Sequence, residues 1–238
     1  MSRFLITNDD GISSDGIVRL ARAARDFGEV VVIAPKKQRS AASHCITLHD
    51  PVDVWPCDFP VDGVMAFSCS GMPADCVRIG CLHLLQDKPD VVLSGINYGY
   101  NVASDVQYSA TVGAAFEGAC QGCLSIALSE KACDRHEVTD AYLPVILEKL
   151  LKKTLPSHSI FNVNFPGCSL ADYRGIQEDL QISKGMIYRD HFRVLDSLPG
   201  GGLRLMTQGI YNEEAEHGTD FRAVIDNYIS IGIVRNVG

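Results

Sequence analysis

The chain has 238 residues and a formal net charge of −8, from 21 basic and 29 acidic side chains. Apolar residues make up 46% of the chain and charged residues 21%, which is ordinary for a globular protein and excludes intrinsic disorder as its main character. The acidic balance argues against a protein that binds a nucleic-acid duplex, and no apolar run approaches the ~18–20 residues of a membrane helix.

Two further features bear on the cellular compartment. The apolar run Phe4-Leu5-Ile6 is too short for a signal peptide, so we expect a cytoplasmic protein. The nine cysteines are odd in number and scattered, which suits reduced thiols better than a disulfide framework. Cys120 and Cys123 have Cys-x-x-Cys spacing, but no second pair accompanies them, and we interpret them as packing residues.

Most of the chain alternates between predicted strands and helices. In chain order, the apolar patterns predict a strand at 4–7, a helix at 17–27 closed by Gly28, strands at 30–34 and 64–67, a helix at 76–85, a strand at 91–93, a helix at 111–119, a strand at 124–128, a helix at 145–151 with Pro144 in its first turn, and a strand at 160–165. Continuously apolar strands between helices indicate an α/β fold. We expect a Rossmann-like, mostly parallel sheet with helices on both faces.

The pattern changes after about residue 175. Segments 185–195 and 203–210 predict a β-hairpin around the turn Pro199-Gly200-Gly201-Gly202. Two strands cannot make their own core, so we expect the hairpin to pack on the main domain or on a second subunit. A short helix at 220–226 and a strand at 228–234 follow. The predicted organisation is one domain, 1–238, with a Rossmann-like core at 1–180, a protruding hairpin at 185–210 and a C-terminal segment at 219–238.

Polar loops follow three of the predicted strands, where ligands bind in parallel sheets. Asp9 and Asp10 follow the first strand, Ser40 lies after the second, and Asn97 follows the strand at 91–93. Taken singly, each could be an ordinary turn or solvated residue. Together, two carboxylates, a hydroxyl and an amide oxygen suit Mg²⁺, Mn²⁺ or Ca²⁺ better than Zn²⁺.

A hydroxyl-rich segment, Ser109-Ala110-Thr111, precedes the predicted helix at 111–119. A helix start presents free N–H groups and can bind a phosphate, although Ser109 or Thr111 could simply cap the helix. Three common motifs are missing from the sequence: the dinucleotide-binding Gly-x-Gly-x-x-Gly, the P-loop and the nucleophile elbow Gly-x-Ser-x-Gly. The sequence therefore favours a metal and phosphate site over these alternatives.

Eight motifs occur in one order along nearly the whole chain. They are Thr7-Asn8-Asp9-Asp10-Gly11, Ala34-Pro35, Arg39-Ser40-Ala41, Gly71-Met72-Pro73-Ala74-Asp75-Cys76-Val77, Ser94-Gly95-Ile96-Asn97-Tyr98-Gly99-Tyr100-Asn101, Asn162-Val163-Asn164-Phe165-Pro166, Thr219-Asp220 and Tyr228-Ile229-Ser230-Ile231. In these motifs the chain resembles the survival protein E (SurE) family of metal-dependent nucleotidases. The resemblance implies a Rossmann-like fold with a swapped hairpin used in oligomerisation, and a homodimer or a tetramer.

The resemblance also implies the site. One divalent cation per subunit, Mg²⁺ or Mn²⁺ with Ca²⁺ as a further candidate, is expected on Asp9, Asp10, Ser40 and Asn97. Nucleoside 5′-monophosphates, and 3′-monophosphates as a second class, are the expected substrates, hydrolysed by a metal-activated water. Substrate-binding residues are expected to be Asn97, Asn101, Ser109, Ala110 and Thr111, and catalytic residues Asp9, Asp10, Asn101 and Ser109, with Asp9 orienting the water.

Several alternatives stay open at this point. The family usually has glycine where this chain has Ala110 and proline where it has Tyr100, and a methyl group at 110 could weaken phosphate binding. A non-catalytic nucleotide- or metal-binding module, or a phosphatase acting on short polyphosphate, is therefore an alternative function. Tyr98 and Tyr100 could stack on a nucleobase or only shield the loop. Because the chain ends at Gly238, soon after the last predicted strand, we expect a dimer in preference to a tetramer.

Overall fold

The computed structural model describes residues 2–236. Met1, Val237 and Gly238, at the ends of the expected domain and of its C-terminal segment, lie outside the described residues. Nine strands form the main sheet: β1 (Ser2–Thr7), β2 (Gly28–Pro35), β3 (Val54–Pro56), β4 (Met65–Cys69), β5 (Val91–Tyr98), β6 (Leu124–Glu130), β7 (Ser159–Phe165), β8 (Gly175–Gln177) and β11 (Tyr228–Arg235).

The strand order across this sheet is β3-β4-β2-β1-β5-β6-β7-β11-β8. All neighbours pair in parallel except β3 with β4 and β11 with β7. After β1 and β2 the chain adds β4 on one side of β1 and then crosses to add β5 on the other. The strand order therefore reverses between β1 and β5, which is where open α/β sheets bind their ligands.

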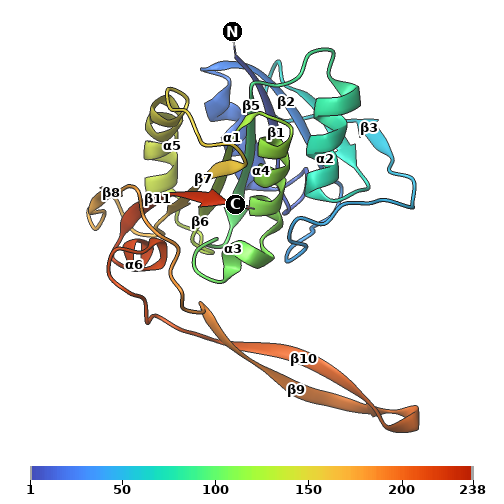
Figure 1. Cartoon of the computed structure of the whole chain (residues 1–238), viewed down its shortest axis with the longest axis vertical. Helices are drawn as coiled ribbons and strands as arrows, with labels where there is room; N and C mark the ends of the chain where they lie inside the picture. Colours follow the sequence, from blue (N-terminus) through green and yellow to red (C-terminus); the bar gives the residue numbers. More distant parts are fainter. Residues whose placement is uncertain (1, 237–238) are drawn as a thin grey trace.

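Helices cover both faces of the sheet (Figure 1). The helical segments are α1 (Asp15–Ala24), α2 (Pro73–Ile79) with the π-helical η1 (Gly80–Leu84), α3 (Asp105–Tyr108), α4 (Ala110–Cys120), α5 (Glu137–Leu150) and α6 (Asp220–Ile225). Phe4 and Ile6 of β1 pack with α1 and α5, whereas Leu5 packs on the opposite face with residues of α2 and α4. Burial on both faces explains the continuously apolar strands, and the predicted fold class is confirmed.

Two expectations about helix boundaries were wrong. Gly28 does not close α1 but begins β2, where a Cβ atom would lie 2.0 Å from the Ser2 carbonyl oxygen, so close strand packing is what requires glycine. Pro144 does not begin its helix either, because α5 starts at Glu137 and contains Pro144 in its interior. The buried face of α5, which includes Leu143 and Ile146, outweighs the one backbone hydrogen bond that proline removes.

The predicted hairpin is present and projects away from the sheet (Figure 1). Strands β9 (Tyr188–Leu198) and β10 (Gly202–Tyr211) pair antiparallel around the turn Pro199–Gly201, where Gly200 has a φ of 75°. Ten large apolar side chains of the hairpin are 37–64% exposed: Tyr188, Phe192, Val194, Leu195, Leu198, Leu203, Leu205, Met206, Ile210 and Tyr211. Across residues 2–236, no helix combines the length and apolar character needed to cross a membrane.

Candidate active site

A cavity of about 780 Å³ opens where the carboxyl ends of β1 and β5 meet. Five of the sequence-predicted residues line it, namely Asp9, Ser40, Asn97, Asn101 and Ser109. The other three do not line the cavity: Asp10 and Ala110 directly follow the lining residues Asp9 and Ser109, and Thr111 lies two positions after Ser109. The structure therefore gathers the loops after β1, β2 and β5 and the start of α4 around one space.

The turn after β1 is built by Asn8. Its side-chain oxygen accepts a hydrogen bond from Gly11 N (3.2 Å), and its Nδ2 donates to Gly11 O (3.0 Å) and Ser14 Oγ (2.7 Å). Gly11 has a φ of 101°, a conformation that favours glycine. Asn8 thus closes the turn that presents the two carboxylates, a role that the sequence reasoning did not assign to it.

Asp9 is 3% exposed, and no basic side chain among residues 2–236 forms an ion pair with it. Its Oδ1 accepts a hydrogen bond from Thr111 Oγ1 (2.6 Å). The pKa of Asp9 is raised from 3.8 to about 6, mainly by burial, with the hydrogen bond from Thr111 opposing the rise and the charge of Asp10 adding to it. The ionised form of Asp9 therefore lacks a compensating positive charge within the protein.

Asp10 is half-buried, and its Oδ2 accepts a hydrogen bond from Tyr98 N (3.0 Å). Burial also raises the pKa of Asp10. In the part of the chain that the structure describes, no lysine, arginine or histidine forms an ion pair with Asp9 or Asp10. Two neighbouring carboxylates without a cationic side chain are a favourable place for a divalent cation.

The remaining predicted metal ligands are an amide and a hydroxyl. Asn97 Nδ2 donates to Gly99 O (2.8 Å), which leaves Oδ1 as the acceptor that Asn97 can offer to a cation. Ser40 is exposed on the next loop, which is tied to the site by a bond from Arg39 N to Asp9 O (2.7 Å). This all-oxygen set fits a hard divalent cation, and Asp9 and Asp10 supply its negative charge.

The three predicted substrate-binding residues at the start of α4, Ser109, Ala110 and Thr111, have different contacts. Ser109 caps the helix, because its Oγ accepts from Val112 N (3.1 Å), while its hydroxyl hydrogen stays available to the cavity. Thr111 is fully buried and holds Asp9. Ala110 is fully buried too and is not one of the cavity-lining residues. The Ala110 N–H has no partner inside its own helix.

Asn101 is fixed by a network of polar side chains from neighbouring strands. Its Nδ2 donates to Ser129 Oγ (2.7 Å), and its backbone N donates to Asn164 Oδ1 (2.8 Å). Its carbonyl oxygen accepts from Asn162 Nδ2 (2.8 Å) and Asn164 Nδ2 (3.2 Å). Asn101 is 4% exposed and held on several sides, which keeps its side-chain amide at the cavity wall.

Five tyrosines line the rest of the cavity: Tyr98, Tyr100, Tyr108, Tyr188 and Tyr211. Tyr98 and Tyr108 are more than half exposed, and burial raises the pKa of Tyr100. Tyr188 and Tyr211 come from the base of the hairpin, with their ring centroids 5.7 Å apart. The sequence indicates only Tyr98 and Tyr100 as base-stacking candidates, because no pattern in it places the base of the hairpin at this site.

The cysteines do not form a second site among residues 2–236. All nine are free thiols, and no group of three or more His, Cys, Asp or Glu side chains is placed to hold a metal. Cys120 is exposed, whereas Cys123 is buried and its Sγ donates to Pro89 O (3.1 Å). The two residues of the Cys-x-x-Cys pair thus occupy different environments.

Comparison with known proteins identifies the family. A family model described as Survival protein SurE matches residues 4–185. The chain belongs to the SurE family. It is 40% identical over 235 residues to 5′-nucleotidase SurE of Alkaliphilus metalliredigens, a match that covers 96% of this chain and 91% of the relative.

Two further SurE proteins are similar to this chain over nearly its whole length. The chain is 36% identical over 229 residues to 5′-nucleotidase SurE of Thermosipho melanesiensis, with 95% of this chain and 89% of the relative covered. The crystal structure of the SurE protein from Aquifex aeolicus matches with a TM-score of 0.81 at 33% identity, over 98% of this chain and 93% of that chain. Both the fold and the family expected from the motifs are therefore confirmed.

Proposed function

We propose that this SurE-family chain is a metal-dependent nucleotidase that hydrolyses nucleoside 5′-monophosphates, and 3′-monophosphates as a second class, to nucleoside and phosphate. One observation carries the proposal: the buried Asp9 contacts Thr111 at the start of α4, and neither Asp9 nor the adjacent Asp10 forms an ion pair with a basic side chain among residues 2–236. A cation site beside free helix N–H groups suits a phosphate ester. The relatives named 5′-nucleotidase SurE support the same activity.

The site residues have separate roles in this reaction. Asp9, Asp10, Ser40 and Asn97 would hold one Mg²⁺ or Mn²⁺. A cation bound there supplies positive charge to the phosphate and lowers the pKa of the attacking water. Because Thr111 occupies Oδ1 of Asp9, the other carboxylate oxygen is left to orient that water and accept its proton.

The phosphate oxygens are bound by donors at the cavity wall. The Ser109 hydroxyl and the Ala110 N–H donate from the start of α4. A half-turn of the Asn101 amide directs Nδ2 to the phosphate, while the Ser129 hydroxyl, which can donate as well as accept, binds Oδ1 instead. These donors stabilise the charge that develops on the phosphoryl oxygens.

The cavity wall favours a nucleotide over polyphosphate. Its volume of about 780 Å³ suits a nucleoside, and its five tyrosines offer faces for a base. Lys131 is the single basic residue of the lining in the described chain, against the acidic Asp105, Asp190 and Glu213. This mostly acidic lining would repel the additional phosphate groups of a polyphosphate. The position of Ala110, buried and outside the cavity lining, supports the nucleotidase over a non-catalytic binding module.

Phosphate release from a panel of 5′- and 3′-nucleoside monophosphates tests the function. We expect release to stop in EDTA and to return when Mg²⁺ or Mn²⁺ is restored, with nucleotides hydrolysed well ahead of a generic phosphomonoester and of tripolyphosphate. Folded protein that releases no phosphate with either metal would favour a binding module. Faster release from tripolyphosphate would favour the polyphosphatase alternative.

We also propose that the hairpin joins two copies of the single domain into a homodimer, with a tetramer as the larger alternative. The exposed apolar side chains of β9 and β10 need a covering partner. Replacing residues 189–210 by a short glycine-serine turn is expected to give a monomer, measured by size-exclusion chromatography with light scattering. A wild-type chain that is already monomeric would contradict this.

Nucleotide substrates and nine free thiols both suit the cytoplasm, where we propose the protein acts.

A further inference from the structure

The loop that carries Asn97 is held between the ends of two neighbouring strands. On one side, Tyr98 N donates to Asp10 Oδ2 (3.0 Å), and on the other, Gly99 N donates to the backbone oxygen of Glu130 (2.9 Å). Tyr98 also pairs with Glu130 in the register of β5 and β6. Since Asn97 Nδ2 binds Gly99 O, the position of Gly99 decides where the Asn97 side chain points.

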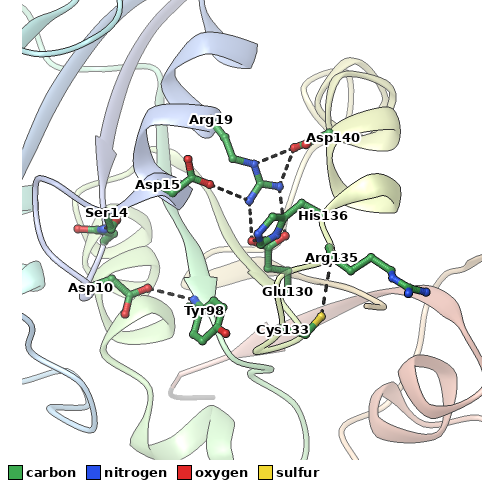
Figure 2. Close-up of polar contacts among 11 residues, drawn as sticks. Asp10, Ser14, Asp15, Arg19, Tyr98, Glu130, Cys133, Arg135, His136 and Asp140 are labelled. Carbon is green, nitrogen blue, oxygen red and sulfur yellow. Dashed lines mark hydrogen bonds and ion pairs between the residues drawn. The ribbon is translucent and has the colours of Figure 1, made fainter. Parts of the chain in front are cut away.

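The side chain of Glu130 is buried and paired with Arg19 of α1, as Figure 2 shows. Arg19 Nη1 lies 2.6 Å from Glu130 Oε1, and Nη2 lies 3.2 Å from Oε2, so the contact is bidentate. The exposed fraction is 10% for the Arg19 side chain and 4% for that of Glu130. A bidentate pair at this depth fixes both distance and orientation, because two parallel hydrogen bonds restrict rotation.

Further contacts prevent this pair from moving as a unit. Arg19 Nε and Nη2 reach Asp140 Oδ1 of α5 at 2.8 and 2.6 Å, and Nη1 lies 3.5 Å from Asp15 Oδ2 in its own helix. His136 Nδ1 lies 3.0 Å from Glu130 Oε1 (Figure 2). The cluster thus connects α1, the end of β6 and the start of α5, and it lies outside the cavity lining.

Helix α1 links the same cluster to the carboxylates. It begins five residues after Asp10, and at Gly16 a Cβ atom would lie 2.1 Å from the Ile96 carbonyl oxygen. The helix therefore rests directly on the strand that leads to Asn97. Arg19 is anchored on the helix that follows Asp9 and Asp10, and Glu130 is anchored on the strand end that holds Gly99.

We propose that Arg19 and Glu130 are a positioning pair that sets the distance between the Asp9–Asp10 turn and Asn97, and thereby the affinity for the divalent cation. Neither residue touches the cation or the substrate. The proposal rests on the proposed function, since it concerns the cation that the nucleotidase reaction requires. Outer groups that orient metal ligands typically change metal affinity by about 10–100-fold when they are replaced.

The test measures cation binding without turnover. Binding of Mn²⁺ is followed by the electron paramagnetic resonance signal of the free ion, in Glu130→Gln and in the double variant Arg19→Met with Glu130→Leu. We expect both to bind Mn²⁺ about tenfold more weakly than wild type, with faster hydrogen exchange at the Gly99 amide. Asp226→Asn, which removes the carboxylate of the Arg222–Asp226 ion pair at the C-terminal end of α6, is the control and should bind normally.

The double variant distinguishes weaker Mn²⁺ binding caused by loss of the bidentate contact from weaker binding caused by unfolding. Removing one partner leaves a buried charge unpaired, whereas replacing both by apolar side chains restores stability without restoring the bidentate contact. Folded variants that bind Mn²⁺ as tightly as wild type would overturn the positioning role and leave the proposed function intact. Wild-type protein that binds no Mn²⁺ would overturn both.

Discussion

The Asp9→Asn variant is expected to release phosphate about 10³–10⁴-fold more slowly than wild type at saturating Mn²⁺. The substitution keeps the shape of the side chain and an oxygen that Thr111 can bind. In the proposed mechanism, the substitution removes the charge that attracts the cation and the group that accepts a proton from the attacking water. The loss should appear mainly in kcat, because the proposed phosphate-binding residues Ser109, Ala110 and Asn101 are unchanged.

Single-turnover and steady-state assays on folded Asp9→Asn protein make this measurement, with Asp226→Asn as the control for loss of a carboxylate outside the site. Circular dichroism establishes that the variant is folded. An Asp9→Asn enzyme with near-normal turnover in the presence of metal would show that Asp9 is neither a metal ligand nor a base. The catalytic assignment would then have to be abandoned.

The same substitution is expected to stabilise the metal-free protein at pH 7 by about 3 kcal/mol. Burial raises the pKa of Asp9 from 3.8 in the unfolded chain to about 6 in the folded one. Between these values the folded state binds more protons than the unfolded state, so this group lowers stability as pH rises from about 4 to about 6. Asparagine carries no charge and lacks this contribution, while a bound cation offsets it in the wild type.

Urea unfolding in EDTA at pH 4, 5, 6 and 7 measures the difference between the two proteins. The advantage of the variant should grow with pH and level off above about 6. Asp220, whose pKa is also raised to about 6 by burial, contributes equally to both proteins and cancels in the difference. A difference in unfolding free energy that stays constant with pH would show that Asp9 titrates normally and is not held in a buried, uncompensated state.

The central sheet was predictable because its strands are buried on both faces and therefore read as apolar runs. The edge strand Val54–Pro56 was not, since it is short and largely exposed and carries no such pattern. The start of α5 was misplaced because Pro144 was interpreted as a beginning, although the buried face of the helix extends back to Val138. The local sequence pattern indicates which secondary structure a residue favours, and tertiary packing decides which structure forms where these tendencies conflict.

The candidate metal ligands were predictable for a simple reason: each lies at or after the carboxyl end of a strand, and parallel strands end at a common edge. The groups that support them were not, because their partners lie far away in sequence. Asn101 is bound by Asn162 and Asn164, some sixty positions later, and Thr111 meets Asp9 across 102 positions. Thr111 was expected to help bind the phosphate, and the hydrogen bond from its hydroxyl to the Asp9 carboxylate is a contact that the sequence pattern does not indicate.

The hairpin has a consequence for how this enzyme can diverge. Tyr188 and Tyr211 stand at its root and line the cavity, while the apolar ribbon continues outward from the same two strands. A change in the twist of the hairpin would therefore also move two aromatic rings of the cavity wall. With the dimer contact and the nucleotide site that we propose, one stretch of chain would affect both subunit assembly and substrate range.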